Sequence, residues 1–189
     1  MKIDKDRFFV TADTHYSHRN ICSSTTEWMD KDTRQFASID AMNNTIVNRI
    51  NEKVPHDGVL FHLGDWSFGG IAKIAEFRHR LNVREIHLIL GNHDHHMEAG
   101  RELDNFTSVQ YYKEITVNNQ LIILFHYGMR VWRHNYKGSW HLYGHSHGSL
   151  PSFGQSMDVG VDTHDFKPYS FGDLQILKKN KIEIVDHHE

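Results

Sequence analysis

The apolar positions in the first half of the chain form short unbroken runs that alternate with stretches of helical spacing. Arg7–Ala12, Gly58–Leu63 and Glu85–Leu90 are the unbroken runs, and each predicts a buried strand. Between them, Ser38–Lys53 and Ile71–Leu81 carry apolar residues three and four apart, and the first of these segments begins with a residue suited to N-capping. The first half therefore predicts the order β-α-β-α-β.

The second half contains further short apolar segments that are separated by polar turns rather than by helical patterns. The predicted strands are Tyr111–Val117, Leu121–Phe125, His141–Tyr143, Met157–Val161, Leu174–Lys178 and Lys181–Val185. The first two and the last two are predicted hairpins, which turn at residues 118–120 and at 179–180. The second half is therefore expected to be mostly antiparallel. Together the two halves predict an α/β protein with two packed mixed β-sheets flanked by helices.

Length and composition support one compact, globular domain over residues 1–189. The chain shows no internal repeat, low-complexity tract or flexible linker, and 39% of its residues are hydrophobic. Leu121–Phe125 is the longest unbroken apolar run, far short of the roughly 20 residues that cross a bilayer. Neither a signal peptide nor a disulfide is expected, because the amino terminus is charged and Cys22 stands alone. These features predict a cytoplasmic protein without a membrane partner.

Residue types that bind metals follow five of the predicted strands. The chain has 17 histidines, and neutral imidazole is a common metal ligand. Asp-Thr-His at 13–15, Gly-Asp at 64–65 and Gly-Asn-His-Asp at 91–94 follow the first three strands. His126 and Gly-His-Ser-His at 144–147 follow two later ones. Because functional groups of α/β folds gather at the carboxyl ends of strands, these residues are expected to meet.

These residue types predict a centre of two metal ions. Residues two apart in an extended segment point the same way, so Asp13 with His15, and His145 with His147, can each bind one ion. Imidazole, carboxylate and amide ligands suit zinc, manganese, iron, cobalt or nickel better than calcium. Seven ligands exceed the need of one tetrahedral ion, and two divalent ions about 3.5–4 Å apart would use them all. The candidate ligands are Asp13, His15, Asp65, Asn92, His126, His145 and His147.

The order of these blocks over residues 13–147 resembles that of the calcineurin-like metallophosphoesterases. Residues 13–21, Asp-Thr-His-Tyr-Ser-His-Arg-Asn-Ile, are similar to the opening of small stand-alone bacterial and phage members. Residues 158–162 and 165–168 resemble the same members, whereas Gly128 stands where relatives often carry proline. The resemblance implies a four-layer α-β-β-α sandwich and a dinuclear metal-dependent phosphoesterase, with manganese favoured among the possible metals.

The resemblance also implies a role for each site residue. Asp65 would bridge the two ions, and His93 would face the substrate as a general acid or charge stabiliser, oriented by Asp94. In-line attack of a metal-bound hydroxide would then hydrolyse the phosphoester. The implied ligand sets are Asp13, His15, Asp65 and His147 for one ion, and Asp65, Asn92, His126 and His145 for the other.

Other residues allow two interpretations each. His18, in the long irregular segment 14–37, is a candidate substrate-binding residue or a solvated loop histidine. Arg130 could bind a phosphate oxygen or form a surface ion pair. Trp66 and Phe68 could line the site or stack on a base, although packing in the core is the simpler role.

The expected substrate is a small phosphodiester, cyclic nucleotides included. Two divalent ions would bring the formal charge from −3 to about +1, which leaves no long basic footprint for duplex nucleic acid. Phosphomonoesters are the alternative substrate, and single-stranded nucleic-acid ends come third. The alternative to an enzyme is a catalytically silent metal-binding scaffold on the same fold, but all seven ligand positions and His93 carry competent residues.

Overall fold

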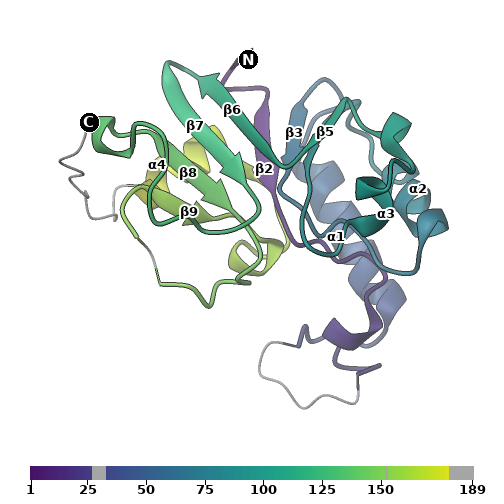
Figure 1. Cartoon of the computed structure of the whole chain (residues 1–189). Helices are drawn as coiled ribbons and strands as arrows, with labels where there is room; N and C mark the ends of the chain where they lie inside the picture. Colours follow the sequence, from purple (N-terminus) through teal and green to yellow (C-terminus); the bar gives the residue numbers. More distant parts are fainter. Residues whose placement is uncertain (27–32, 152, 179–189) are drawn as a thin grey trace.

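The computed structural model describes residues 1–26, 33–151 and 153–178, which form two five-stranded β-sheets with helices around them (Figure 1). The first sheet has the strand order β10-β2-β3-β4-β5 and the second has the order β1-β6-β7-β8-β9. Each sheet contains both parallel and antiparallel pairs. The predicted α/β class with two packed mixed sheets is thus confirmed.

The first sheet is built mainly from the strands that alternate with helices in the sequence. β2 (Phe8–Thr11), β3 (Val59–His62), β4 (Glu85–Ile89) and β5 (Ser108–Gln110) run parallel. β10 (Tyr169–Ser170) joins the free side of β2 in antiparallel orientation. Parallel pairing brings the carboxyl ends of β2, β3 and β4 to one edge, where the polar motifs begin.

The second sheet is centred on a tight hairpin. β6 (Tyr112–Val117) and β7 (Gln120–Phe125) pair antiparallel, and the two asparagines between them both adopt left-handed conformations, with φ of 48° and 65°. Such a turn matches the twist of the flanking strands. β1 (Lys2–Ile3), β8 (Trp140–Tyr143) and β9 (Ser156–Asp158) complete the sheet through parallel pairs.

Two predictions for the second half are wrong. It is not mostly antiparallel, because β8 and β9 each pair parallel to the preceding strand of the sheet. The long connections 126–139 and 144–155 return the chain to the starting edge, which gives parallel pairing. Leu174–Lys178 is not a strand but part of the helix α4 (Phe171–Lys178). Its predicted partner and the turn at 179–180 lie outside the described residues.

Both faces of the first sheet are buried, which explains the unbroken apolar runs of its strands. Phe8 and Val10 of β2 point into an apolar cluster that they share with side chains of the second sheet. Phe9, on the opposite face, packs in a cluster with α1 (Ile39–Lys53) and α2 (Ile71–His79). The predicted N-cap of α1 is confirmed, because the Ser38 side chain accepts a hydrogen bond from the Ala41 N–H.

Short helical segments and loops complete the fold. The outer face of the second sheet is covered in part by the connection after β7, where the Trp132 ring contacts the His141 ring at 5.4 Å between centroids. Within the described ranges, no helix combines the length and the apolar character needed to cross a membrane. The remaining segments are α3 (His95–Glu98) and the 3-10 helices Arg19–Ile21, Leu103–Asn105, Asn135–Lys137 and Val161–Thr163.

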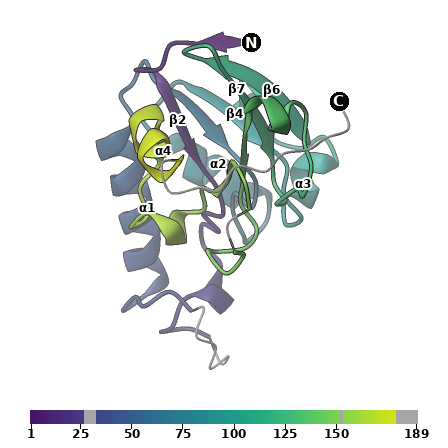
Figure 2. The ribbon, with the colours of Figure 1, turned by 90° about the vertical axis from the view of Figure 1, so that its left-hand side faces the viewer.

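A capping box explains why the last described segment is a helix. The Ser170 backbone N–H and hydroxyl both donate to Asp173 Oδ2, at 2.8 and 2.6 Å, and the Asp173 N–H donates back to the Ser170 hydroxyl. Lys53, at the end of α1, pairs with the same carboxylate at 2.8 Å and links this end of α1 to the first turn of α4 (Figure 2). Burial opposes the charged form, but these partners lower the pKa of Asp173 from 3.8 to about 2.

Replacing Asp173 by asparagine should lower the free energy of unfolding by about 1 kcal/mol at pH 7. Because the pKa of Asp173 is lower in the folded state, the stabilisation exists above about pH 4 and disappears as the pH falls to about 2. Urea unfolding of the metal-free protein at several pH values measures this difference. Asp57→Asn, at an exposed position, is the control, and a deficit that stays constant down to pH 2 would contradict the assignment.

Candidate metal centre

The polar motifs of both sheets meet at one edge of the sandwich. The loops continue the strand pairing, because the Asp13 N–H donates to the Gly64 carbonyl at 3.0 Å and the His15 N–H donates to the Asp65 carbonyl at 2.9 Å. The second sheet joins them through the His145 N–H, which donates to both oxygens of the Asp13 carboxylate. The loops that follow β2, β3 and β8 therefore form one connected structure.

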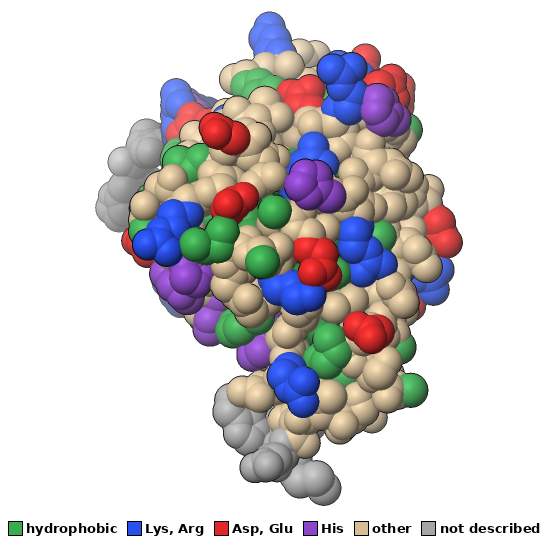
Figure 3. Space-filling view, turned by 90° about the vertical axis from the view of Figure 1, so that its right-hand side faces the viewer, with side chains coloured by type: hydrophobic (Ala, Val, Ile, Leu, Met, Phe, Trp, Pro, Cys, Tyr) green, Lys and Arg blue, Asp and Glu red, His purple; other side chains and the backbone are tan. Residues whose placement is uncertain are grey.

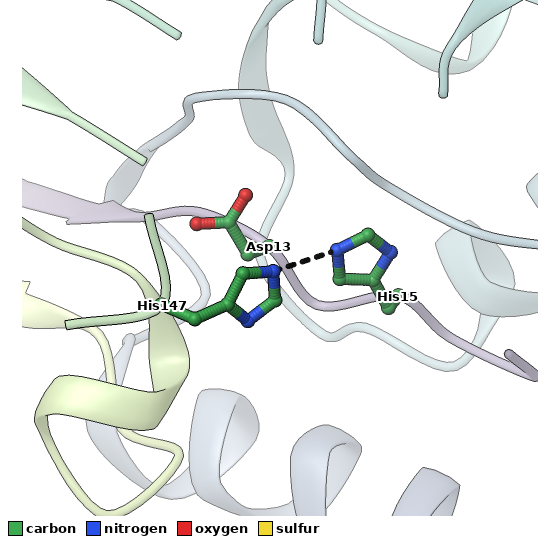
Figure 4. Close-up of side chains that lie close together, drawn as sticks. All are labelled: Asp13, His15 and His147. Atoms are coloured by element: carbon green, nitrogen blue, oxygen red, sulfur yellow. Dashed lines mark hydrogen bonds between the residues drawn. The ribbon is translucent and has the colours of Figure 1, made fainter. Parts of the chain in front are cut away.

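Asp13, His15 and His147 form the first group of candidate ligands. Their ligand atoms all lie within 4.8 Å of one another, so the group could hold a metal ion. Figure 4 shows the three side chains close together, with the rings of His15 and His147 facing each other. The Nε2 atoms of these two rings are 3.2 Å apart. The planes of the two rings are within 16° of parallel, with 5.1 Å between their centroids.

Asp65, His126 and His145 form the second group, whose ligand atoms meet the same limit of 4.8 Å. The amide oxygen of Asn92 belongs with them, because it lies 3.0 Å from His126 Nε2 and 3.0 Å from His145 Nδ1. The ring of His126 is oriented by the Leu63 carbonyl, which is 2.6 Å from Nδ1. This contact leaves Nε2 of His126 facing the centre.

The Asp65 carboxylate, a member of the second group, also faces the first group. Its Oδ2 atom is 3.5 Å from His15 Nε2, and its Oδ1 atom is 3.7 Å from His126 Nε2. Each oxygen thus faces a different group, which is the arrangement expected of a bridging ligand. The structure brings all seven sequence-predicted ligands together, and the assignment of each to an ion remains a prediction.

The ionisation of these groups fits a bound cation. Burial raises the pKa of the Asp13 carboxyl to about 8, since the charged form is poorly solvated there. Burial also lowers the pKa of His15 well below its usual value, so this imidazole stays neutral and able to bind a metal. A divalent cation would stabilise the carboxylate and use the imidazole lone pairs. The residues present therefore fit a pair of divalent ions.

Backbone strain is concentrated at the candidate ligands. A non-glycine residue with positive φ costs of order 1 kcal/mol and persists where the surroundings hold it in place. At the ends of these strands, the conformation turns the chain sharply, so that ligand side chains face the centre. The ligands with positive φ are Asp13 (56°), His15 (46°), Asp65 (57°), His145 (69°) and His147 (48°).

Two glycines let the loops approach this closely. A Cβ atom at Gly91 would collide with Asp65 Oδ1, and one at Gly144 would lie 2.6 Å from Asp13 Oδ2. A side chain at either position would therefore displace a carboxylate of the centre. This requirement explains glycine as the first residue of the 91–94 and 144–147 motifs.

Asp94, which is predicted to orient His93, makes its hydrogen bonds to the backbone, so its role toward His93 stays a prediction. Its carboxylate, 2% exposed, accepts backbone hydrogen bonds from Asp65 and Gly91 at 2.8 Å and from Trp66 at 3.0 Å. Both oxygens thus face main-chain N–H groups rather than the His93 ring. Burial raises the pKa of Asp94 to about 6, although these hydrogen bonds oppose the shift. Asp94 supports the loops that carry Asp65 and Asn92.

A cavity of about 460 Å³ opens over the centre. His93 is exposed there, and its ring lies 5.6 Å from the His15 ring and 4.8 Å from Phe68. His18 also faces the cavity and stacks on Phe68, with 3.6 Å between the ring centroids. Besides candidate ligands, the lining contains His18, Asn20, Ile21, Thr33, His93, Ser146 and Ser149.

Arg130 and Trp66 lie elsewhere. The Arg130 guanidinium is 5.0 Å from the centroid of the Phe153 ring, and Arg130 is absent from the described residues that line the cavity. Trp66 is fully buried in the core, where its indole N–H donates to the Ile74 carbonyl. Packing, the simpler of the two interpretations, therefore holds for Trp66.

Sequence analysis missed three residues that support the centre. Asp158 accepts hydrogen bonds of 2.9 Å from the Ser146 hydroxyl and from the Gly148 N–H, and thus holds the loop that carries His145 and His147. The buried Arg34 forms an ion pair at 2.7 Å with the partly exposed Asp162 side chain beside the first ligand group. Asp158 and Asp162 lie in residues 158–162, whose resemblance to small metallophosphoesterases could have indicated them. Arg34 lies in the irregular segment 14–37, where no motif or periodicity points to it.

Comparisons with known proteins support the fold. No protein-family model matches the chain. The uncharacterized protein MJ1445 of Methanocaldococcus jannaschii is 26% identical over 186 residues, which cover 93% of this chain and 94% of that protein. The crystal structure of AQ665 from Aquifex aeolicus, a protein of unknown function, has a TM-score of 0.63 at 21% identity and covers 94% of this chain and 100% of its own. YfcE, a phosphoesterase from E. coli, has a TM-score of 0.42 at 15% identity over 80% of this chain and 76% of its own.

Replacing Asp65 by asparagine should weaken the binding of both ions, because its two oxygens face different ligand groups. We expect the manganese content after dialysis to fall from two ions per chain to fewer than one. Elemental analysis measures the content, and circular dichroism verifies folding. Asp57→Asn should keep both ions; two tightly bound ions in the Asp65 variant would exclude a bridging role.

Proposed function

We propose that this protein is a metal-dependent phosphoesterase that uses two divalent ions to hydrolyse small phosphodiesters. The observation that carries the proposal is the Asp65 carboxylate, which lines an open cavity and whose two oxygens face His15 of one ligand group and His126 of the other. The resemblance of the motif order to calcineurin-like metallophosphoesterases supports the same reaction. When bound, the two ions would neutralise phosphate charge and lower the pKa of a water molecule toward about 7.

His93 is the proposed proton donor to the leaving oxygen. Its backbone N–H donates to Asp65 Oδ1 at 3.0 Å, so the residue is fixed relative to the carboxylate between the two ligand groups. Its ring is exposed to the cavity and belongs to neither group of candidate metal ligands. An imidazole in this position can stabilise charge on the phosphate oxygens or protonate the leaving group.

The composition of the cavity lining favours diesters over monoesters. Among the described residues, the lining contains histidine, aspartate, asparagine, serine, threonine and isoleucine side chains but no lysine or arginine. A phosphomonoester carries up to two negative charges at neutral pH and gains more from added cations than a singly charged diester does. Phosphomonoesters are therefore the second candidate substrate, and manganese is our choice of metal within the set that the ligands suit.

The size of the site and the charge of the surface favour a small substrate. A volume of about 460 Å³ lies within the usual range for small-molecule sites, about 300–1,000 Å³. On the face shown in Figure 3, acidic and basic side chains are interspersed rather than gathered into a basic stripe. Binding of duplex nucleic acid depends on an extended positive surface, so this face is unsuited to it.

Paired initial rates test the proposal directly. With manganese present, we expect hydrolysis of bis-p-nitrophenyl phosphate to exceed that of p-nitrophenyl phosphate, and a chelator should abolish both. A faster monoester reaction would replace the diesterase assignment by a phosphatase. If the protein binds two ions but hydrolyses neither substrate nor a panel of natural phosphodiesters, the metal-binding scaffold becomes the better description.

Replacing His93 by alanine should leave the metal content unchanged and lower kcat by about 100-fold or more for poor leaving groups. The loss should be smaller for p-nitrophenolate, which departs without protonation. Rates on a series of methyl aryl phosphates, from p-nitrophenyl to phenyl, measure this dependence. His95→Ala is the matched control, since His95 is exposed and absent from the described lining. Equal losses across the series would exclude the role of proton donor.

A further inference from the structure

The buried Arg34 guanidinium contacts the chain segments that carry the first ligand group. Arg34 is 4% exposed and lies between the first ligands and α1 in the sequence. Its Nε and Nη2 atoms donate to the two carboxylate oxygens of Asp162, at 2.7 and 2.8 Å. Nη1 donates to the Thr14 carbonyl at 2.9 Å, and Nη2 donates to the Asp13 carbonyl at 2.6 Å.

Asp162 extends this contact to a metal-ligand candidate. Its Oδ2 atom, which accepts from Arg34, lies 2.7 Å from Nδ1 of His147 and orients that ring. Nε2 of His147 is then left to face His15. A carboxylate on the outer nitrogen of a histidine fixes the ring and strengthens the inner nitrogen as a metal ligand.

The two carbonyl contacts act on a strained part of the backbone. Asp13 and His15 both have positive φ, and Arg34 holds the carbonyls of Asp13 and of the residue between them. One side chain thus restrains the segments that supply Asp13, His15 and His147. None of its four hydrogen bonds reaches the Asp65, His126 and His145 group.

We propose that Arg34 and Asp162 are a positioning pair that sets the geometry of the Asp13–His15–His147 ion site. The pair also joins this site to the wall of the cavity, by which we mean its lining residues Ile21 and Thr33. The Arg34 N–H donates to the Ile21 carbonyl at 2.7 Å, and the Ser23 N–H donates to the Arg34 carbonyl at 2.9 Å. Ile21 and the residue before Arg34 both line the cavity. The metal site and this wall are therefore held by the same residue. The proposal rests on the metal centre described above.

A lysine at position 34 should not reproduce the hydrogen bonds of Arg34. The guanidinium is planar and directs its donors along several fixed directions, which lets it hold a carboxylate and two carbonyls together. An ammonium group places its three donors on one atom and cannot span these acceptors. Arg34→Lys therefore keeps the positive charge at this position and removes the fixed directions of its donors. Asp162→Asn keeps the shape of the side chain and removes the negative charge that contacts both Arg34 and His147.

Manganese titration of the metal-free full-length variants tests the pair. Electron paramagnetic resonance of free manganese and calorimetry give a Kd for each site without any activity measurement. For Arg34→Lys and for Asp162→Asn, we expect one of the two sites to weaken by about 10–100-fold and the other to keep its affinity. With metal saturating, the KM of the Arg34 variant should also rise, because the wall is less well held.

Arg78→Lys is the matched control. Arg78 also donates to backbone carbonyls, those of Asn105 and Arg84, but it lies outside the described lining of the cavity. The control should lose thermal stability without a change in either manganese Kd. The proposal is overturned if Arg34→Lys and Asp162→Asn leave both affinities unchanged, or weaken both sites equally.

The same titration separates this inference from the proposed function. A wild-type protein that binds two manganese ions but hydrolyses no phosphoester would refute the phosphoesterase, while a selective loss in the two variants would still establish the positioning pair. A wild-type protein that binds fewer than two ions would refute both.

Discussion

A central contact between the two sheets is made by the buried Asp13 carboxylate, which accepts the N–H of His145. Asp13 follows a strand of the first sheet and His145 follows a strand of the second, so each candidate ligand group draws residues from both sheets. The apolar cluster between the sheets fixes their relative position. Packing of the core is therefore what brings the ligand atoms within reach of one another, and small shifts between the sheets would separate them.

Bringing these ligands together costs free energy in the folded state. Positive φ at five ligands costs of order 1 kcal/mol for each, and burial of Asp13 disfavours its charged form. Side chains outside the ligand sets offset these costs by holding the loops, as Asp94 and Asp158 do through backbone N–H groups. A bound cation would offset the same costs, so metal binding is expected to increase folding stability.

The sequence predicts the parts of this structure that depend on local pattern. α1 and its cap, the buried parallel strands and the position of each ligand at a strand end follow from periodicity and residue type. Strand direction in the second half does not, because it depends on where long connections return the chain. The roles of Asp94 and Arg34 depend on backbone groups that are distant in sequence, and no spacing rule identifies them.

The two ligand groups are supported in different ways, and this difference has consequences for how the site can vary. His126 is oriented by the Leu63 carbonyl, a main-chain group that a side-chain substitution does not remove. His147 is oriented by Asp162, which in turn depends on Arg34, so a single substitution at either position can alter its ion site. The first group also shares Arg34 with the wall of the cavity. Under the proposed function, a change in substrate preference that acts through this wall would therefore also affect the Asp13, His15 and His147 group.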